Sequence, residues 1–282
     1  MARAVVVGVD GSADSLRAVD WAAETAGCLG RPLHVVHAVS GHSPHAYREA
    51  DEADRLLRVA EARARAGRTA DEVTTATVYS DPDTALLNAA GDAFTLVVGA
   101  RGNGDMKELL VGSVGLAVAA RAPCPVVVVR DTSMATAIRG ARLLLGVEDT
   151  SAGGGAVRFA FALAGACGGV IDAVSAWHRT PRTKISAVLD LPRHPELAAQ
   201  HAEEDLRAAL AEERTRHAAV EVHTRVAEGP ARDVLLKASE TADLLVVGAE
   251  ARPSRTGLYL GRVNHALLHH VRCPVAIVPG DR

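Results

Sequence analysis

Short apolar runs rich in Val, Leu and Ile alternate along the chain with longer stretches in which apolar residues recur at helical spacing. In the first half this pattern predicts strands near residues 3–9, 33–39, 73–78, 95–99 and 125–130. It predicts helices at roughly residues 13–28, 46–67, 83–92 and 113–121. Strands that alternate with helices are typical of a parallel sheet covered by helices, so we expect an α/β protein.

The same features return in the second half of the chain. The segment around Gly8 and Asp10 is echoed around Gly146 and Glu148, a shift of 138 residues. Later segments, such as the one ending in Gly99, return with a shift of 149 residues, here at Gly248. The second copy therefore carries about eleven extra residues after its second strand, where three prolines indicate a longer loop: Pro181, Pro192 and Pro195.

The repeat predicts two doubly wound, open, parallel five-stranded sheets in tandem. We place the first domain at residues 1–131 and the second at residues 141–282. Residues 132–140 have no strong periodicity and are the predicted linker.

Composition and charge exclude several classes of protein. The 282 residues are 48% hydrophobic, which is enough to fill two cores, and the formal net charge of −3 includes no basic block. We therefore expect no nucleic acid partner. No apolar stretch approaches the roughly 20 residues that cross a bilayer, and Asp10 interrupts the N-terminal apolar run, which is typical of a strand instead of a signal peptide.

The four cysteines are far apart in the sequence and form no CxxC pair: Cys28, Cys124, Cys167 and Cys273. This spacing fits neither a disulfide framework nor a zinc ribbon, so we expect a reducing, cytoplasmic location. Two of them, Cys124 and Cys273, occupy matching positions before the last strand of each copy, where we expect small, buried and inert side chains.

The richest motif in candidate chemistry follows the fourth strand of the first copy and reads Gly99-x2-Gly102-x9-Gly112-Ser113. Glycines let a backbone approach a ligand closely and tolerate positive φ. Gly112 and Ser113 begin a predicted helix, whose unpaired amides favour a phosphate. We interpret the motif as a phosphate cradle; the alternative is a connecting loop with a serine-capped helix.

In open parallel sheets, ligands bind beyond the carboxyl ends of strands where the strand order reverses. Asp10, at the end of the first strand, is then placed to accept hydrogen bonds from a ribose, and Ala38, at the end of the second, to line an adenine pocket. Asp10 equally fits a turn, with Gly11 and Ser12, that caps the first helix. We include Gly11 and Ser12 among the candidate contacts, and Arg101 and Lys107 either meet phosphate oxygens or remain solvated.

With Asp10, the glycine motif and the tandem repeat, the chain resembles the universal stress protein family over almost its whole length. The resemblance implies the universal stress protein/adenine nucleotide alpha hydrolase-like fold, with strand order 3-2-1-4-5 and domains paired through their last strands. It also implies ATP, with or without Mg²⁺, as the ligand. The matching contact positions are Asp10, Ala38, Gly99, Gly102, Gly112, Ser113 and Val114.

The second copy departs from this pattern. It keeps the first and third glycines as Gly248 and Gly261, but Ala251 replaces the second glycine, Arg262 the serine and Glu148 the aspartate. Ala251 disfavours positive φ, and Arg262 either binds a phosphate or fills its place. Nucleotide binding by this half is therefore left open, with Glu148, Gly248, Gly261 and Arg262 as its candidate residues.

One further cluster suggests a metal. His265 and His269 lie four residues apart on a predicted helix, close to Cys273, which is a spacing that zinc sites use. The alternative is a pair of histidines near a helix C-terminus, where the helix dipole favours them. No carboxylate belongs to the pattern, so we predict no metal site.

These residues predict a nucleotide-responsive stress or regulatory protein. The alternatives are an interaction module built from the same repeat that binds no nucleotide, and a slow ATPase. The sequence has no GxxxxGK[ST] loop and no catalytic constellation, so it supports no strong catalysis. We expect the two halves to pair about a pseudo-twofold axis and two chains to form a homodimer that covers the remaining sheet edge.

Overall fold

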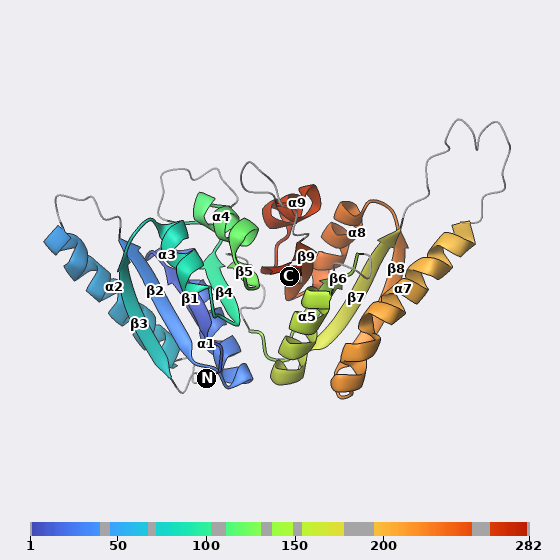
Figure 1. Cartoon of the computed structure of the whole chain (residues 1–282), viewed down its shortest axis with the longest axis horizontal. Helices are drawn as coiled ribbons and strands as arrows, with labels where there is room; N and C mark the ends of the chain where they lie inside the picture. Colours follow the sequence, from blue (N-terminus) through green and yellow to red (C-terminus); the bar gives the residue numbers. More distant parts are fainter. Residues whose placement is uncertain are drawn as a thin grey trace.

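The chain forms one twisted sheet with helices on both faces (Figure 1). The computed structural model describes residues 2–39, 46–66, 72–102, 111–130, 137–148, 154–177, 195–249 and 260–280. The predicted linker lies partly outside these ranges. The residues from 103 to 110, which include Lys107, and the predicted longer loop with Pro181 and Pro192 lie wholly outside them.

The first half contains five strands: β1 (Val5–Val9), β2 (Leu33–Val39), β3 (Val73–Tyr79), β4 (Thr95–Gly99) and β5 (Val126–Val129). Its helices are α1 (Ala13–Leu29), α2 (Ala46–Ala66), α3 (Pro82–Ala89) and α4 (Ser113–Arg121). All of these elements were predicted within a few residues. Helix α3 ends three residues earlier than predicted, because the chain turns at Ala90 and Gly91 before it enters β4.

The second half repeats this arrangement. Its strands are β6 (Arg142–Gly146), β7 (Val170–Trp177), β8 (Glu221–Glu228), β9 (Leu244–Ala249) and β10 (Val275–Pro279). Its helices are α5 (Gly154–Cys167), α7 (Pro195–Arg216), α8 (Ala231–Ala238) and α9 (Arg262–His270), with a short 3₁₀ turn η1 (Ser239–Thr241) before β9. Pro195, one of the prolines that indicated a loop, begins α7, where a fixed φ suits a first helical position.

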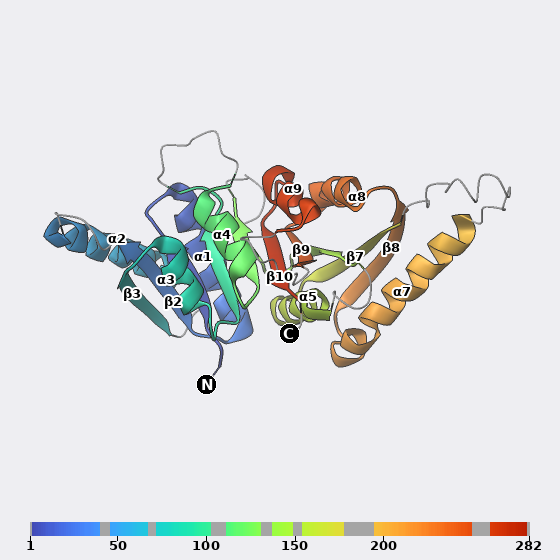
Figure 2. The same cartoon turned by 45° about the horizontal axis from the view of Figure 1, so that its top comes forward.

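The strand order is β3-β2-β1-β4-β5-β10-β9-β6-β7-β8. Each half therefore has the predicted order 3-2-1-4-5, and strands within a half run parallel. The halves meet at β5 and β10, which pair antiparallel with Val127 opposite Ala276. The two predicted sheets are thus one continuous sheet, and the predicted pairing through the last strands is confirmed (Figures 1 and 2).

The central strands are buried on both faces, which explains their nearly uninterrupted apolar sequence. All five residues of β1 and all four of β5 are buried. One face packs against α1, α2, α5 and α7 in a core that runs through both halves, and the other packs against α3, α4, α8 and α9. The two halves therefore share their cores as well as their sheet.

The outermost strands are β3 and β8. Both are more exposed and more polar than the central strands, with Thr74, Thr75, His223 and Arg225 facing solvent. The edge that each half would expose beside its last strand is covered inside the chain by the β5–β10 pair. A homodimer that covers an edge would have to use β3 or β8, and it stays a prediction.

None of the helices in the described ranges combines the length and the apolar character that crossing a membrane requires.

Candidate functional site

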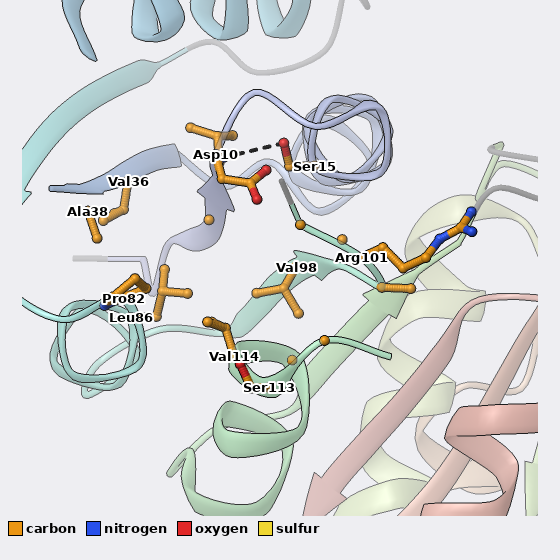
Figure 3. A pocket seen from close by; sticks show the side chains of 17 residues that line it. Asp10, Ser15, Val36, Ala38, Pro82, Leu86, Val98, Arg101, Ser113 and Val114 are labelled. Atoms are coloured by element: carbon orange, nitrogen blue, oxygen red, sulfur yellow. Dashed lines mark hydrogen bonds between the residues drawn. The ribbon is translucent and has the colours of Figure 1, made fainter. Parts of the chain in front are cut away.

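A cavity of about 460 Å³ opens where the carboxyl ends of β1, β2 and β4 meet the N-termini of α3 and α4 (Figure 3). This volume is within the usual range for a small-molecule site. Its position is the reversal of strand order, because β1 pairs with β2 on one side and β4 on the other. The lining residues are Gly8, Val9, Asp10, Ser15, Val36, Ala38, Pro82, Leu86, Val98, Gly99, Ala100, Arg101, Gly102, Gly112, Ser113, Val114 and Gly115.

The three glycines of the motif line the cavity together, but not because they need positive φ. In the described part of the chain, positive φ occurs at other glycines, such as Gly11. A Cβ on Gly99 would lie 2.7 Å from backbone atoms of Asp14 and Ser15, so this glycine lets β4 pack closely on the first turn of α1. A Cβ on Gly102 would lie 2.5 Å from Asp10 Oδ2. Gly102 therefore leaves room for the Asp10 carboxylate.

The N-terminus of α4 closes the same end of the cavity. Gly112 is the N-cap, and its amide donates to the Ala100 carbonyl at 2.7 Å, which holds the helix start against the loop after β4. The first intrahelical bond runs from the Leu116 amide to the Gly112 carbonyl. The amides of Ser113, Val114 and Gly115 thus belong to the first turn, where backbone donors have no intrahelical acceptor and attract anions.

Asp10 lies at the exposed mouth of the cavity, beside the end of β1. Its Oδ1 accepts a hydrogen bond from the Ser12 amide at 3.0 Å, and its amide donates to Ser15 Oγ at 3.3 Å. These contacts make the turn that begins α1, as the alternative interpretation of Asp10 predicted. Figure 3 shows the carboxylate pointing toward the cavity, so the turn role and a ligand-facing role coexist.

Ser12 stabilises the start of α1 and does not line the cavity. It is the N-cap, and its hydroxyl accepts from the Ser15 amide at 3.1 Å and donates to the Arg101 carbonyl at 3.1 Å. The structure does not bring Ser12 or Gly11 into the cavity lining. Gly11 lines an adjoining, more open hollow of about 410 Å³ with Asp10, His37 and Glu52.

Arg101 lines the cavity, but its charge is already paired. Its amide and its Nε both donate to Asp14 Oδ2 at 3.2 Å, and Asp14 is buried while Arg101 is half exposed. In Figure 3 the guanidinium extends away from the other labelled side chains. Arg101 therefore ties the loop after β4 to α1, and the described geometry does not aim its charge at the cavity centre.

The opposite end of the cavity is apolar. Val36 and Ala38 come from β2, Pro82 and Leu86 from α3, and Val98 from β4. Sequence analysis identified only Ala38 of these. A usable signal existed, because the connection from β3 to β4 must cross β2 and β1, which places the first turn of α3 above the carboxyl end of β2.

The second half holds its candidate residues in equivalent places. Glu148 follows β6, Gly248 lies in β9, and Gly261 and Arg262 begin α9. Asn264 stands where the first half has Gly115, and its buried side-chain amide donates to the Gly248 carbonyl at 2.9 Å. The residues from 149 to 153 and from 250 to 259, which include Ala251, lie outside the described ranges. Besides Glu148 and Arg262, this half therefore differs from the first by the Asn264 side chain, which binds the carbonyl of Gly248, the first glycine of its motif.

The remaining candidates lie away from the cavity. The rings of His265 and His269 on α9 have centroids 4.5 Å apart and planes tilted by 40°, and no set of three metal-binding side chains gathers within the described ranges. Burial raises the pKa of the Cys124 thiol to about 11 and that of the Cys273 thiol to about 12. Thiols with such pKa values stay protonated at neutral pH and react slowly.

Two doubly wound halves are joined at their last strands, and the first half has a cavity where its strand order reverses. These features define a class of tandem α/β proteins. The family model described as the universal stress protein family matches residues 1–130 and 141–279. The chain belongs to this family.

Known relatives support the same assignment. Universal stress protein Rv2005c of Mycobacterium tuberculosis is 33% identical over 97% of this chain and 96% of its own length. The crystal structure of a universal stress protein from Archaeoglobus fulgidus superposes with a TM-score of 0.73 at 17% identity, covering 98% of both chains. A universal stress protein solved in complex with cAMP is 34% identical, but it covers 46% of this chain with a TM-score of 0.39, so that ligand is a property of that protein.

Proposed function

We propose that the first half binds an adenine nucleotide, with ATP as the ligand, and that occupancy regulates what the protein contacts. The observation that carries the proposal is the cavity itself, which is apolar at one end and has glycines and the α4 N-terminus at the other. An adenine needs an apolar slot, and a phosphate needs backbone amides without a competing side chain.

The orientation follows from this polarity. The base would lie between β2 and α3, against Val36, Ala38 and Leu86. The ribose would reach the Asp10 carboxylate, which accepts hydrogen bonds from hydroxyl groups. The phosphates would lie over Gly102 and the first turn of α4 at Ser113, where amides and the helix dipole favour negative charge.

Magnesium fits this arrangement only as a companion of the phosphates. In the described lining, Asp10 is the carboxylate at the cavity, and it already accepts a bond from the Ser12 amide. Mg²⁺ commonly binds through one or two carboxylates together with substrate phosphates. Asp10 would therefore contribute at most one protein ligand.

Regulation would arise from the chain between Gly102 and Gly112, because both of its ends line the cavity. The residues between them, 103–110, lie outside the described ranges, so the proposal concerns the contact that a ligand makes with both ends, which is the contact through which occupancy would act. The second half would supply a structural partner. This role is favoured by Asn264, whose side chain occupies the position that Gly115 leaves free in the first half.

Calorimetric titration of nucleotide-stripped protein with ATP, ADP and AMP tests the proposal. We expect about one site per chain. Gly102→Ala should weaken binding, because its Cβ would displace the flexible end of Asp10, and Ser113→Ala should weaken it by removing a hydroxyl from the phosphate end. Gly91→Ala is the control, since Gly91 does not line the cavity and the nearest atom to its Cβ would be the Asn88 carbonyl oxygen at 3.4 Å. Absence of heat for every nucleotide would reject the proposal and favour an interaction module.

A further inference from the structure

The halves touch through two helices as well as through the sheet. Helices α1 and α5 pack together on one face, and their residues belong to one buried core. The Glu24 side chain on α1 accepts a hydrogen bond from the Ile138 amide at 3.1 Å, and Ile138 is fully buried. Phe94 and Phe159 add a ring contact between the halves, with centroids 5.6 Å apart. This contact holds the C-terminal parts of α1 and α5 in a fixed relation.

Two cysteines, one from each half, meet in this contact. Cys28 is the penultimate residue of α1 and Cys167 is the last residue of α5. Cys28 packs on the core that contains Cys167 and lies one turn after Glu24, the residue that binds the Ile138 amide. Two residues after Ile138, the Gly140 amide donates to the Cys167 carbonyl at 2.9 Å, so both cysteines lie at the same end of the contact between α1 and α5. The Cys28 thiol also contributes to the raised pKa of Cys167. Cys167 is 6% exposed, whereas Cys28 is half-buried.

The pair is not a product of the repeat. With the shift of 138 residues, the counterpart of Cys28 is Ala166 and the counterpart of Cys167 is Leu29. The other two cysteines are repeat counterparts, Cys124 and Cys273, and both are buried in the core on the opposite face of the sheet. Two thiols that are 139 positions apart in sequence, one from each half, therefore meet only because the chain folds back on itself.

We propose that Cys28 and Cys167 form a redox modification site, in which a hydroperoxide converts the two thiols to a disulfide that covalently joins the two halves. This proposal is independent of nucleotide binding. A disulfide closes the long loop between the cysteines, which restricts the unfolded chain and stabilises the folded one. Reversible disulfides in reducing compartments are typically redox-sensing.

The chemistry balances in two steps. The Cys28 thiolate attacks the terminal oxygen of a hydroperoxide, which breaks the O–O bond and gives a sulfenic acid. The departing oxygen takes up the proton that was released when the thiolate formed, and leaves as an alcohol, or as water from hydrogen peroxide. The Cys167 sulfur then attacks the Cys28 sulfur, the S–S bond forms, and the hydroxyl leaves as water with the thiol proton. One hydroperoxide is reduced for each pair of thiols oxidised, and a thiol reductant reverses the change.

The surroundings assign the order of the steps and their speed. Cys28 is the more accessible of the two residues, so it meets the oxidant first. Burial, and then the neighbouring Cys28 thiol, raise the pKa of Cys167 well above its ordinary value, so Cys167 is protonated at neutral pH. Since the thiolate is the nucleophile, the second step is slow and accelerates as the pH rises. The site would respond to sustained oxidant instead of brief exposure.

The test oxidises the purified full chain with hydrogen peroxide and maps it by non-reducing peptide mass spectrometry. We expect a Cys28–Cys167 cross-linked peptide with the loss of two hydrogens, a melting temperature several degrees higher than that of the reduced chain, and reversal of both by dithiothreitol. Cys28→Ser and Cys167→Ser should each abolish the link and the shift. Cys124→Ser and Cys273→Ser are the matched controls, and both should retain them.

Each alternative result counts against the proposal. A link through Cys124 or Cys273, or one between two chains, would overturn it, and so would terminal oxidation of Cys28 without any link. Because the cross-linked peptide is sought in the unmodified chain, the test does not depend on whether the serine variants fold.

Discussion

At the scale of single residues, the glycines after β4 have different tasks within one motif. Gly99 exists for packing, because the backbone of the first turn of α1 occupies the place of its missing side chain. Gly102 faces the movable end of an aspartate, and Gly112 has its nearest neighbours at ordinary contact distance. The same residue type therefore supports the fold at one position and the cavity at the next.

This difference predicts separable effects. Gly99→Ala forces a methyl group against backbone atoms of Asp14 and Ser15 that cannot move without displacing α1. Overpacking of this kind costs about 1–3 kcal/mol in the free energy of unfolding, which urea denaturation measures. Gly91→Ala is the control, because the nearest atom to its Cβ is the Asn88 carbonyl oxygen at 3.4 Å. Equal stability of the two variants would show that the α1 backbone leaves room for a Cβ at Gly99.

The sequence predicted the motif but could not separate these tasks. A glycine pattern reports that side chains are missing, whereas the atoms that fill the space come from α1, far from the motif in sequence. Arg101 illustrates the same limit. Its position beside Gly102 suggested a phosphate contact, but Asp14, a residue that sequence analysis did not single out, holds its guanidinium.

At the scale of elements, the start of α1 joins the cavity to the helix. The Ser12 hydroxyl caps α1 and also holds the Arg101 carbonyl, so one side chain fixes both the helix end and the loop after β4. Strands and helices were predictable because their apolar spacing is local. This cross-link between two elements was not, because it depends on β1 and β4 being neighbours in the sheet.

Ser12→Ala should therefore destabilise the protein by about 1 kcal/mol, the usual cost of losing an N-cap side chain. Chemical denaturation provides the measurement. Ser113→Ala is a suitable control for stability, because its hydroxyl is exposed and forms no hydrogen bond with the described residues. If the two variants were equally stable, the Ser12 cap would contribute nothing measurable.

The strands of the second half carry a polar cluster that gives stability a pH dependence. Asp172 on β7 accepts from Arg142 at 2.7 Å and lies 3.0 Å from His223 Nδ1. Burial alone raises the pKa of Asp172, but the hydrogen bonds and charges of Arg142 and His223 outweigh it, so the folded pKa lies below its ordinary value. A carboxylate with a depressed folded pKa stabilises the protein above its unfolded pKa and loses this effect as the pH falls.

Asp172→Asn should consequently lower the urea midpoint at pH 7, and the difference from the parent protein should shrink once the pH falls below about 4, the ordinary pKa of an aspartate. Urea titrations at pH 7 and at about pH 3 compare the two conditions. Asp233→Asn, at an exposed and loosely paired position, should change little at either pH. A difference that is constant with pH would contradict the assigned role of the charge.

At the scale of the whole molecule, the two repeats share one sheet and a continuous core instead of forming two separate domains. The tandem organisation and the pairing of last strands followed from the repeat and from the family resemblance. The continuity of the core did not, because the residues that join α1 to α5 are not repeated motifs. Phe159 packs on Phe94 of the other half, while Arg31 lies 4.4 Å from the Phe94 ring centroid.

A shared sheet and a shared core predict that the halves unfold together. The chain has two tryptophans, the buried Trp21 in the first half and Trp177 in the second. In Trp177→Phe, Trp21 fluorescence reports the first half while far-ultraviolet circular dichroism reports the whole chain. Coincident urea transitions are expected, as a cooperative all-or-none transition requires.

Phe159→Ala extends this test, because the substituted residue belongs to the second half and its ring contacts Phe94 of the first. Removing a buried aromatic ring costs about 3–5 kcal/mol, and Phe159 is 4% exposed. In the Trp177→Phe background, the transition of Trp21 should therefore shift to lower urea although no residue of its own half is substituted. Leu235→Ala removes a core side chain on the opposite face of the second half. It should also shift the Trp21 transition to lower urea if the molecule unfolds as one body. If neither substitution shifted the Trp21 transition, the halves would unfold independently despite the shared strands.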